Sequence, residues 1–308
     1  MTLSVGVAVD FAPVAGESYA ARLDALAPIL DAVDWLELAA VSAGESATLE
    51  PDDPMRFHAP NSLLMLAAVA ERTAAPQLIA GALLLGAWPT DRLLADLELM
   101  YGLTGDRFTL TVGLGPEHLW ARRGVPRESI GAAADAALAE LATRFPDRER
   151  WVGGAVGRSA RRAATLGTGF SASTGYPFEV VARQAAAYRA HGGTGPVSVN
   201  RVCVIAETRD AARAVAARGV DPLLTAYAGA GTTGPHATAA ARADALGIVG
   251  TPKDAVAKLS RYVAAGVTHL QLRVVPGRTP VSAAVETLQA FVNDVLPHVD
   301  SGRFEEEM

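Results

Sequence analysis

The chain has 308 residues, 50% of them hydrophobic, and carries 27 Lys and Arg against 33 Asp and Glu for a formal net charge of -6. This length and composition can bury a large core, and the negative charge gives no basis for binding nucleic acid. The N-terminus has no basic stretch before a long apolar run, and no segment approaches roughly 18 uninterrupted apolar residues. We therefore expect a cytoplasmic protein that neither is secreted nor spans a membrane. The single cysteine, Cys203, lies in an apolar run away from other ligand types, which predicts a buried thiol and no metal site.

Short apolar runs rich in β-branched residues alternate along the chain with longer segments of helical periodicity. The predicted strands cover residues 3–10, 35–41, 77–85, 107–115, 150–154, 169–173, 197–206 and 268–274. The predicted helices cover residues 17–33, 61–73, 91–103, 158–166, 177–191, 209–218 and 281–299. Local signals support several helix ends: Thr208 and Thr251 suit N-caps, Pro252 suits a first helical position, and Gly105 suits a helix-ending turn.

Eight strand and helix alternations over about 300 residues fit a (β/α)8 barrel better than a doubly wound sheet, which needs roughly five or six strands. We predict one α/β barrel domain over residues 1–300, followed by a tail at 301–308. Residues 221–247 break the rhythm with a cluster rich in Gly and Thr. They are interpreted as a flexible insertion near the barrel mouth, with a surface loop without a role as the alternative.

The carboxyl ends of barrel strands hold the chemistry, so candidate residues are sought there. Gly154, Gly157, Arg158 and Ser159 follow the fifth strand and open a helix, where free N–H groups, the helix dipole, a guanidinium and a hydroxyl can bind a phosphate. A capped helix with an exposed arginine is the alternative. This loop is the predicted phosphate site.

Three titratable residues follow the second and fourth strands. His58 lies on the loop after the second strand and is the first choice for an active-site base. Glu117 and His118 follow the fourth strand, where a carboxylate and an imidazole can transfer protons. A solvated pair of loop side chains is the alternative for these two residues.

Five blocks, taken in order, resemble the luciferase-like monooxygenase superfamily, which includes bacterial luciferase, FMN-dependent monooxygenases and F420-dependent reductases. The blocks are residues 62–73, 103–108, 151–167, 206–212, and 250–256 with 265–270. Each block is generic alone, but together their order and spacing cover nearly the whole chain. The resemblance implies a luciferase-like (β/α)8 barrel.

The resemblance also assigns a flavin site. It implies that the flavin phosphate lies at the loop carrying Ser159, although Ala155 and Val156 replace the usual polar pair. It implies that the isoalloxazine ring rests on the end of the third strand, at Leu84, Leu85 and Gly86. Gly113 and Gly115 would leave room for the ring, with plain packing as the alternative. The remaining lining is predicted to come from Asp10, Phe11, Ser171, Ser173, Tyr176, Arg201 and Arg273.

Two departures from the family bear on function. Its members often carry an acid and a histidine at the end of the second strand, whereas residues 39–42 read Ala-Ala-Val-Ser here. They also generally insert a longer segment between the fourth and fifth strands than residues 116–150 provide.

The resemblance implies an oxidoreductase that uses reduced FMN, or alternatively F420, to oxidise or reduce a small organic substrate. It further implies a homodimer and a separate flavin reductase as partners. The alternative is a degenerate barrel that binds a flavin-like ligand or a protein partner without turnover. The missing acid and histidine pair favours that alternative, and the Gly-rich loop after the fifth strand favours the enzyme.

Overall fold

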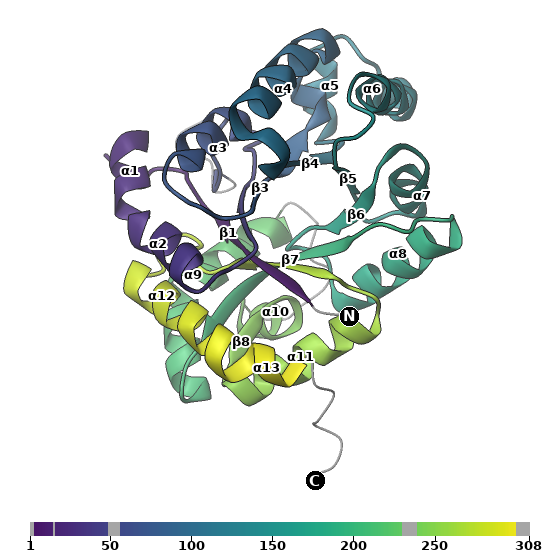
Figure 1. Cartoon of the computed structure of the whole chain (residues 1–308). Helices are drawn as coiled ribbons and strands as arrows, with labels where there is room; N and C mark the ends of the chain where they lie inside the picture. Colours follow the sequence, from purple (N-terminus) through teal and green to yellow (C-terminus); the bar gives the residue numbers. More distant parts are fainter. Residues whose placement is uncertain (1–2, 15, 49–55, 230–238, 300–308) are drawn as a thin grey trace.

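The computed structural model describes residues 3–14, 16–48, 56–229 and 239–299. Nine parallel strands are assigned among these residues, and eight of them close a barrel that helices surround (Figure 1). The strands are β1 (Ser4–Val9), β2 (Ala40–Ala43), β3 (Gln77–Leu84), β4 (Phe108–Gly113), β5 (Arg150–Gly153), β6 (Gly169–Ala172), β7 (Val197–Ile205), β8 (Ile248–Gly250) and β9 (His269–Arg273). Pairing runs in order from β1 to β7, then through β9 back to β1. The predicted (β/α)8 barrel is confirmed.

The helices form the outer layer. They are α1 (Tyr19–Ala25), α2 (Ala27–Trp35), α3 (Ser62–Ala70), α4 (Thr90–Thr104), α5 (Glu117–Ala121), α6 (Ile130–Arg144), α7 (Gly157–Leu166), α8 (Phe178–Ala190), α9 (Arg209–Gly229), α10 (Ala239–Leu246), α11 (Pro252–Ala264), α12 (Val281–Ala290) and α13 (Leu296–Val299). Short 3-10 turns lie at Leu85–Ala87, Gly105–Arg107 and Arg127–Ser129, and a π turn lies at Phe291–Val295. The interval between β4 and β5 thus holds α5 and α6.

The two faces of the barrel wall differ in chemistry. Outward residues such as Val5, Val7 and Val9 belong to the large apolar core beneath the helices. Residues in register with Gly6 line the inside, because a Cβ on Gly6 would meet the side chains of Gln271 and Ala40. Following that register, the inner face toward the carboxyl ends carries small and polar residues: Ser42, Gly81, Thr111, Gly153, Ser171, Asn200 and Gln271.

The predicted boundaries around β2 are wrong. The strand expected at 35–41 begins only at Ala40, because Trp35 still ends α2 and Glu37 takes a positive φ of 54° in the turn that follows. The helix expected at 17–33 is divided at Leu26, which ends α1 and precedes α2 with its early proline. Aromatic and leucine residues at 35–38 therefore belong to a helix end and a turn.

The predicted capping residues are found in place. Thr251 and Asp254 form a reciprocal capping box at the start of α11, and Thr208 accepts a hydrogen bond from the amide of Ala211. Gly105 follows α4 with a φ of 62°. Cys203 is buried, as expected, and burial raises the pKa of its thiol.

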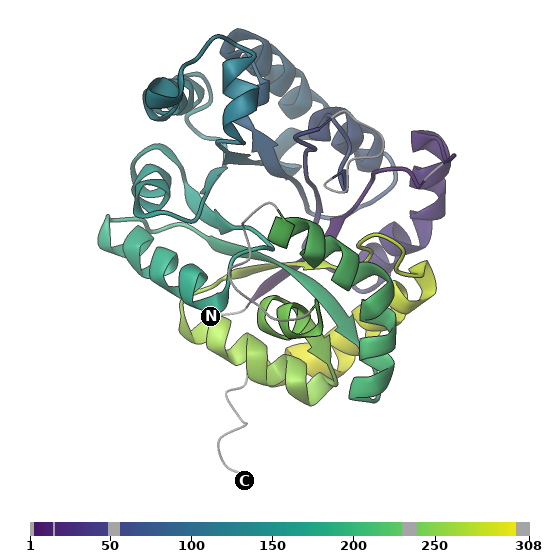
Figure 2. The same cartoon turned by 180° about the vertical axis from the view of Figure 1, so that it is seen from behind.

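The region after β7 is more regular than expected. Residues 221–229 continue α9, and residues 239–246 form α10. β8 pairs with Cys203–Ile205, at the carboxyl-terminal end of β7. These elements enclose a second apolar cluster of their own. Figure 2 shows α9, in green, reaching toward the centre of the barrel. Most of the Gly- and Thr-rich cluster lies at 230–238, outside the described residues.

Candidate functional site

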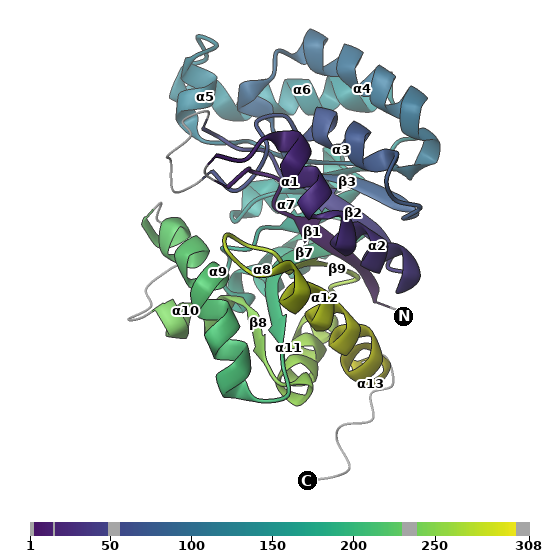
Figure 3. The ribbon, with the colours of Figure 1, turned by 90° about the vertical axis from the view of Figure 1, so that its left-hand side faces the viewer.

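The carboxyl ends of the strands form a mouth at one end of the barrel. Seen from the side, α5 and the last turns of α9 lie at this same end (Figure 3). Tyr227 of α9 reaches the strand ends directly, because its hydroxyl lies 3.1 Å from Nη1 of Arg273. We therefore consider the mouth, which also holds the buried charges of Asp10 and Arg273, as the candidate site.

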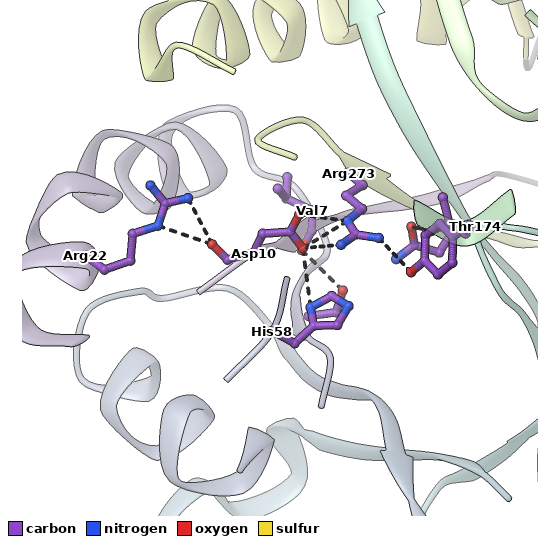
Figure 4. Close-up of polar contacts among 9 residues, drawn as sticks. Val7, Asp10, Arg22, His58, Thr174 and Arg273 are labelled. Carbon is purple, nitrogen blue, oxygen red and sulfur yellow. Dashed lines mark hydrogen bonds and ion pairs between the residues drawn. The ribbon is translucent and has the colours of Figure 1, made fainter. Parts of the chain in front are cut away.

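A buried ion pair joins the ends of β1 and β9. Nε of Arg273 lies 2.9 Å from both carboxylate oxygens of Asp10, and Nη2 lies 2.7 Å from Oδ1. Both residues are nearly inaccessible, at 1% and 3% exposure. Arg22 donates to the main-chain carbonyl of Asp10, so the residue is held at both its side chain and its backbone (Figure 4).

His58 completes this group from the loop before α3. Its Nδ1 lies 3.3 Å from Oδ1 of Asp10, and its side chain is 20% exposed (Figure 4). Phe57, next to it, packs against Tyr227 with ring centroids 6.0 Å apart. The guanidinium of Arg273 lies over both rings, at 5.4 Å from Phe57 and 6.0 Å from Tyr227. The loop after β2 and helix α9 thus meet over the charged pair.

Electrostatics in this group favour a neutral imidazole. Burial, with the positive charge of Arg273 adding to it, lowers the pKa of His58 well below its ordinary value. Burial raises the pKa of Asp10, and Arg273 opposes that effect. Nδ1 of His58 lies in contact with the carboxylate of Asp10 but makes no hydrogen bond of good geometry.

Glu45 is a site residue that the sequence prediction missed. It follows the true end of β2 by two residues, is 6% exposed, and accepts hydrogen bonds from the amide of Leu84 at 2.8 Å and the indole of Trp88 at 3.0 Å. Burial raises its pKa to about 7. Correct placement of the strand end would have revealed this acid; the next residue is Ser46, so the strand end supplies no histidine.

A wall of small, partly exposed residues lies beside these groups. A Cβ on Gly81 would meet nothing closer than 3.6 Å, and one on Gly113 nothing closer than 3.8 Å. Leu84 is half-buried above them, at the bulged end of β3. Gly113 and Leu84 of the predicted ring site are therefore brought together on a partly exposed wall of small residues.

Three other residues predicted for the ring site lie further back. Leu85 and Gly86 are buried behind the strand end, where a Cβ on Gly86 would lie 2.8 Å from the Trp120 indole. Gly115 takes a φ of 76° in the turn toward α5. Packing is the role that these contacts demonstrate for them.

The predicted phosphate loop forms the start of α7. Ser159 is buried beneath Gly154, and a Cβ on Gly154 would lie 2.1 Å from its Oγ. Gly157 has no neighbour within 4 Å of such a Cβ, and Arg158 is exposed at the first turn. The four residues are together, with one guanidinium available at a free helix N-terminus.

The remaining candidates are dispersed around the rim. Glu117 pairs with Arg127 at 3.4 Å, and His118 contacts the carbonyl of Ala47 at 3.3 Å; both lie exposed on α5. Ser173 is exposed after β6, and Arg201, fully buried, donates to its carbonyl at 3.0 Å. Arg201 thus fixes the loop after β6 from behind.

The part of the chain that the structure describes lacks both a metal-binding cluster and a membrane-spanning helix. It contains no group of three or more His, Cys, Asp or Glu side chains arranged to hold a metal ion. None of its helices combines the length and apolarity required to cross a bilayer.

Solved structures share this architecture over nearly its whole length, whereas no family model and no curated protein matches the sequence. The monooxygenase RslO1 from Streptomyces bottropensis superposes with a TM-score of 0.80 at 20% identity, covering 96% of this chain and 99% of that one. The oxygenating constituent of 3,6-diketocamphane monooxygenase from Pseudomonas putida, in complex with FMN, gives 0.76 at 16% identity and covers 97% and 99%.

An F420-dependent secondary alcohol dehydrogenase, in complex with an F420-acetone adduct, gives a TM-score of 0.73 at 10% identity, again covering 97% of this chain and 99% of that one. The matches therefore include both FMN and F420 proteins. At these identities they establish the fold. The chain has the (β/α)8 barrel fold of the luciferase-like monooxygenases and the F420-dependent oxidoreductases.

Proposed function

We propose that the protein is a luciferase-like oxidoreductase that binds reduced FMN, or alternatively F420, at the barrel mouth and acts on a small organic substrate. The observation that carries the proposal is the wall of partly exposed small residues at Gly81 and Gly113 beside the buried group of Asp10, Arg273 and His58. A flat ring and a proton-handling group would then lie side by side at the mouth of the barrel.

The residues present fit such a cofactor. Gly81 and Gly113, which carry no side chains, and the half-buried Leu84 offer a flat apolar surface to a ring, and Arg158 with the first N–H groups of α7 offers positive charge to a phosphate. When bound, the reduced cofactor supplies the electrons, either to O₂ for oxygenation or as a hydride to the substrate. The protein supplies shape and electrostatics.

His58 is the residue we assign to proton handling. The imidazole lies 3.3 Å from the carboxylate of Asp10, which is itself fixed by Arg273 and Arg22, and the pKa of the imidazole is lowered so that it is neutral near pH 7. Tyr227 and Phe57 cover the group with aromatic surface and restrict water at the charges. The exposed positions of Glu117 and His118 make them weaker candidates for this role.

A degenerate barrel that binds a ligand without turnover is the second candidate. It is favoured by Ser46, which follows Glu45 at the place where the family often has a histidine. Turnover separates the two candidates, since both require ligand binding.

Cofactor binding tests the proposal first. Titration of the purified protein with FMN and with F420 should quench cofactor fluorescence with saturation for one of them. Arg158→Ala should weaken binding about tenfold, the range expected for one charge-assisted phosphate contact. Arg161→Ala, another exposed arginine on α7, is the matched control and should leave binding unchanged. Absence of saturable binding by both cofactors would overturn the proposal.

A further inference from the structure

Glu45 connects three segments of the barrel rim that are far apart in sequence. Its carboxylate accepts the amide of Leu84 at the end of β3, the indole of Trp88 before α4, and the amide of Ser62 at the start of α3. Its own backbone bridges to Ala59 on the returning loop. One buried side chain thus joins the loop after β2 to both neighbouring elements.

The donors around this carboxylate are all neutral. Its pKa of about 7 results from burial, which raises it, against the hydrogen bonds from Leu84, Trp88 and Ser62, which lower it. No charged side chain is among these causes, although Arg56, His58, His118 and Asp91 lie on the segments around it. A buried carboxylate without a cation is expensive to maintain, so its hydrogen bonds must fix its position closely.

The end of β3, whose Leu84 amide binds Glu45, borders the wall that is proposed to face the cofactor ring. β3 changes register with β4 between Gly81 and Leu83, so the ladder does not continue evenly to Leu84. The amide of Leu84 donates a hydrogen bond to Glu45, and the side chain of Leu84 is half-buried beside Gly113. The position of that side chain therefore depends on an acceptor supplied from β2.

We infer that Glu45 is a positioning residue that fixes the end of β3, through Leu84 and Trp88, in the arrangement that shapes the mouth. The inference deepens the proposed function, on which its catalytic meaning rests. The positioning itself is a property of the protein without cofactor and can be measured there.

The first test uses Trp88 as a reporter in the cofactor-free protein. Subtracting the emission of Trp88→Phe from that of the wild type isolates the Trp88 signal, which should change with pH around a midpoint near 7. Glu45→Gln should abolish this titration. Glu149→Gln is the matched control, because Glu149 also accepts side-chain hydrogen bonds but lies at the amino ends of the strands, and it should leave the titration intact.

The second test measures hydrogen exchange in peptides covering residues 83–90. Glu45→Ala should speed exchange at Leu84 at least tenfold, and Glu45→Gln, which keeps one acceptor oxygen, should restore part of the protection. If Glu45→Ala fails to fold, the comparison of Glu45→Gln with the wild type still decides. Unchanged exchange together with an unchanged Trp88 titration would overturn the inference.

Cofactor binding distinguishes this inference from the proposed function. If the inference and the proposed function both hold, Glu45→Ala lowers the affinity for the cofactor at least tenfold. Glu149→Gln then binds the cofactor as the wild type does. If the wild type binds neither FMN nor F420, the proposed function fails. The exchange and emission results would then still decide whether Glu45 fixes the rim.

Discussion

Gly44 and His58 share one space at the end of β2. A Cβ built on Gly44 would lie 2.7 Å from Nε2 of His58 and 2.8 Å from Cδ2 and Cε1. The imidazole therefore fills the position that a side chain on the strand end would take. The strand lacks a histidine, and the loop before α3 places one against its end instead.

Gly44→Ala should push His58 away from Asp10. We expect the added methyl group to destabilise the protein by about 1–3 kcal/mol, because the site is buried and closely packed. Turnover, once a substrate is known, should fall more than cofactor affinity does. Chemical denaturation measures the first effect. Gly102→Ala on the exposed face of α4, where a Cβ meets nothing within 4 Å, is the control and should be neutral or stabilising.

His58→Gln should make the protein less sensitive to acid. The pKa of His58 is lowered in the folded state, so the unfolded chain takes up a proton first as the pH falls below about 6.5. The wild type therefore loses stability on acidification that the glutamine variant retains. Unfolding in urea at pH 8, 6.5 and 5 measures this difference. His191→Gln, on an exposed helix end, should behave like the wild type; equal acid sensitivity of all three proteins would contradict the lowered pKa.

The strands could be predicted because the outer wall of the barrel is apolar and continuous. Runs such as 77–85 and 197–206 match β3 and β7 to within a residue or so, since buried parallel strands leave a clear apolar pattern. β2 has only four residues, and the preceding Trp35 and Leu36 look like strand residues. The error of several residues there arises because short strands carry little pattern beyond their neighbours.

The site was only partly predictable because its contacts are long-range. Arg273 and Asp10 were both placed at strand ends, but only the closed barrel brings residues 263 positions apart into an ion pair. Glu45 was missed because its strand was placed too early. Leu85 and Gly86 were assigned to the ring site by the resemblance; the structure shows that both are buried, with Gly86 packed closely against Trp120.

We propose that two copies of the chain associate through α4. Leu99 and Leu103, four residues apart on one helix face, are 62% and 63% exposed, so this face of α4 presents two adjacent apolar side chains to solvent. The double change of Leu99 and Leu103 to Glu should convert a dimer into a monomer in light scattering after size-exclusion chromatography. Trp35→Glu, an exposed apolar residue on α2, is the control. A monomeric wild type would exclude the dimer.

Glu45→Gln should flatten the dependence of stability on pH above the acidic range. The folded pKa of about 7 lies above the ordinary 4.5, so the folded state holds this proton more tightly than the unfolded chain does. Stability from this group is complete below about pH 4.5 and is lost as the pH rises through about 7, by up to roughly 3 kcal/mol. The variant does not ionise at this position and should not show the loss. Denaturation at pH 5, 6, 7 and 8 measures the difference, with Glu149→Gln as the control; parallel curves for all three proteins would mean that Glu45 ionises as freely as an exposed carboxyl group.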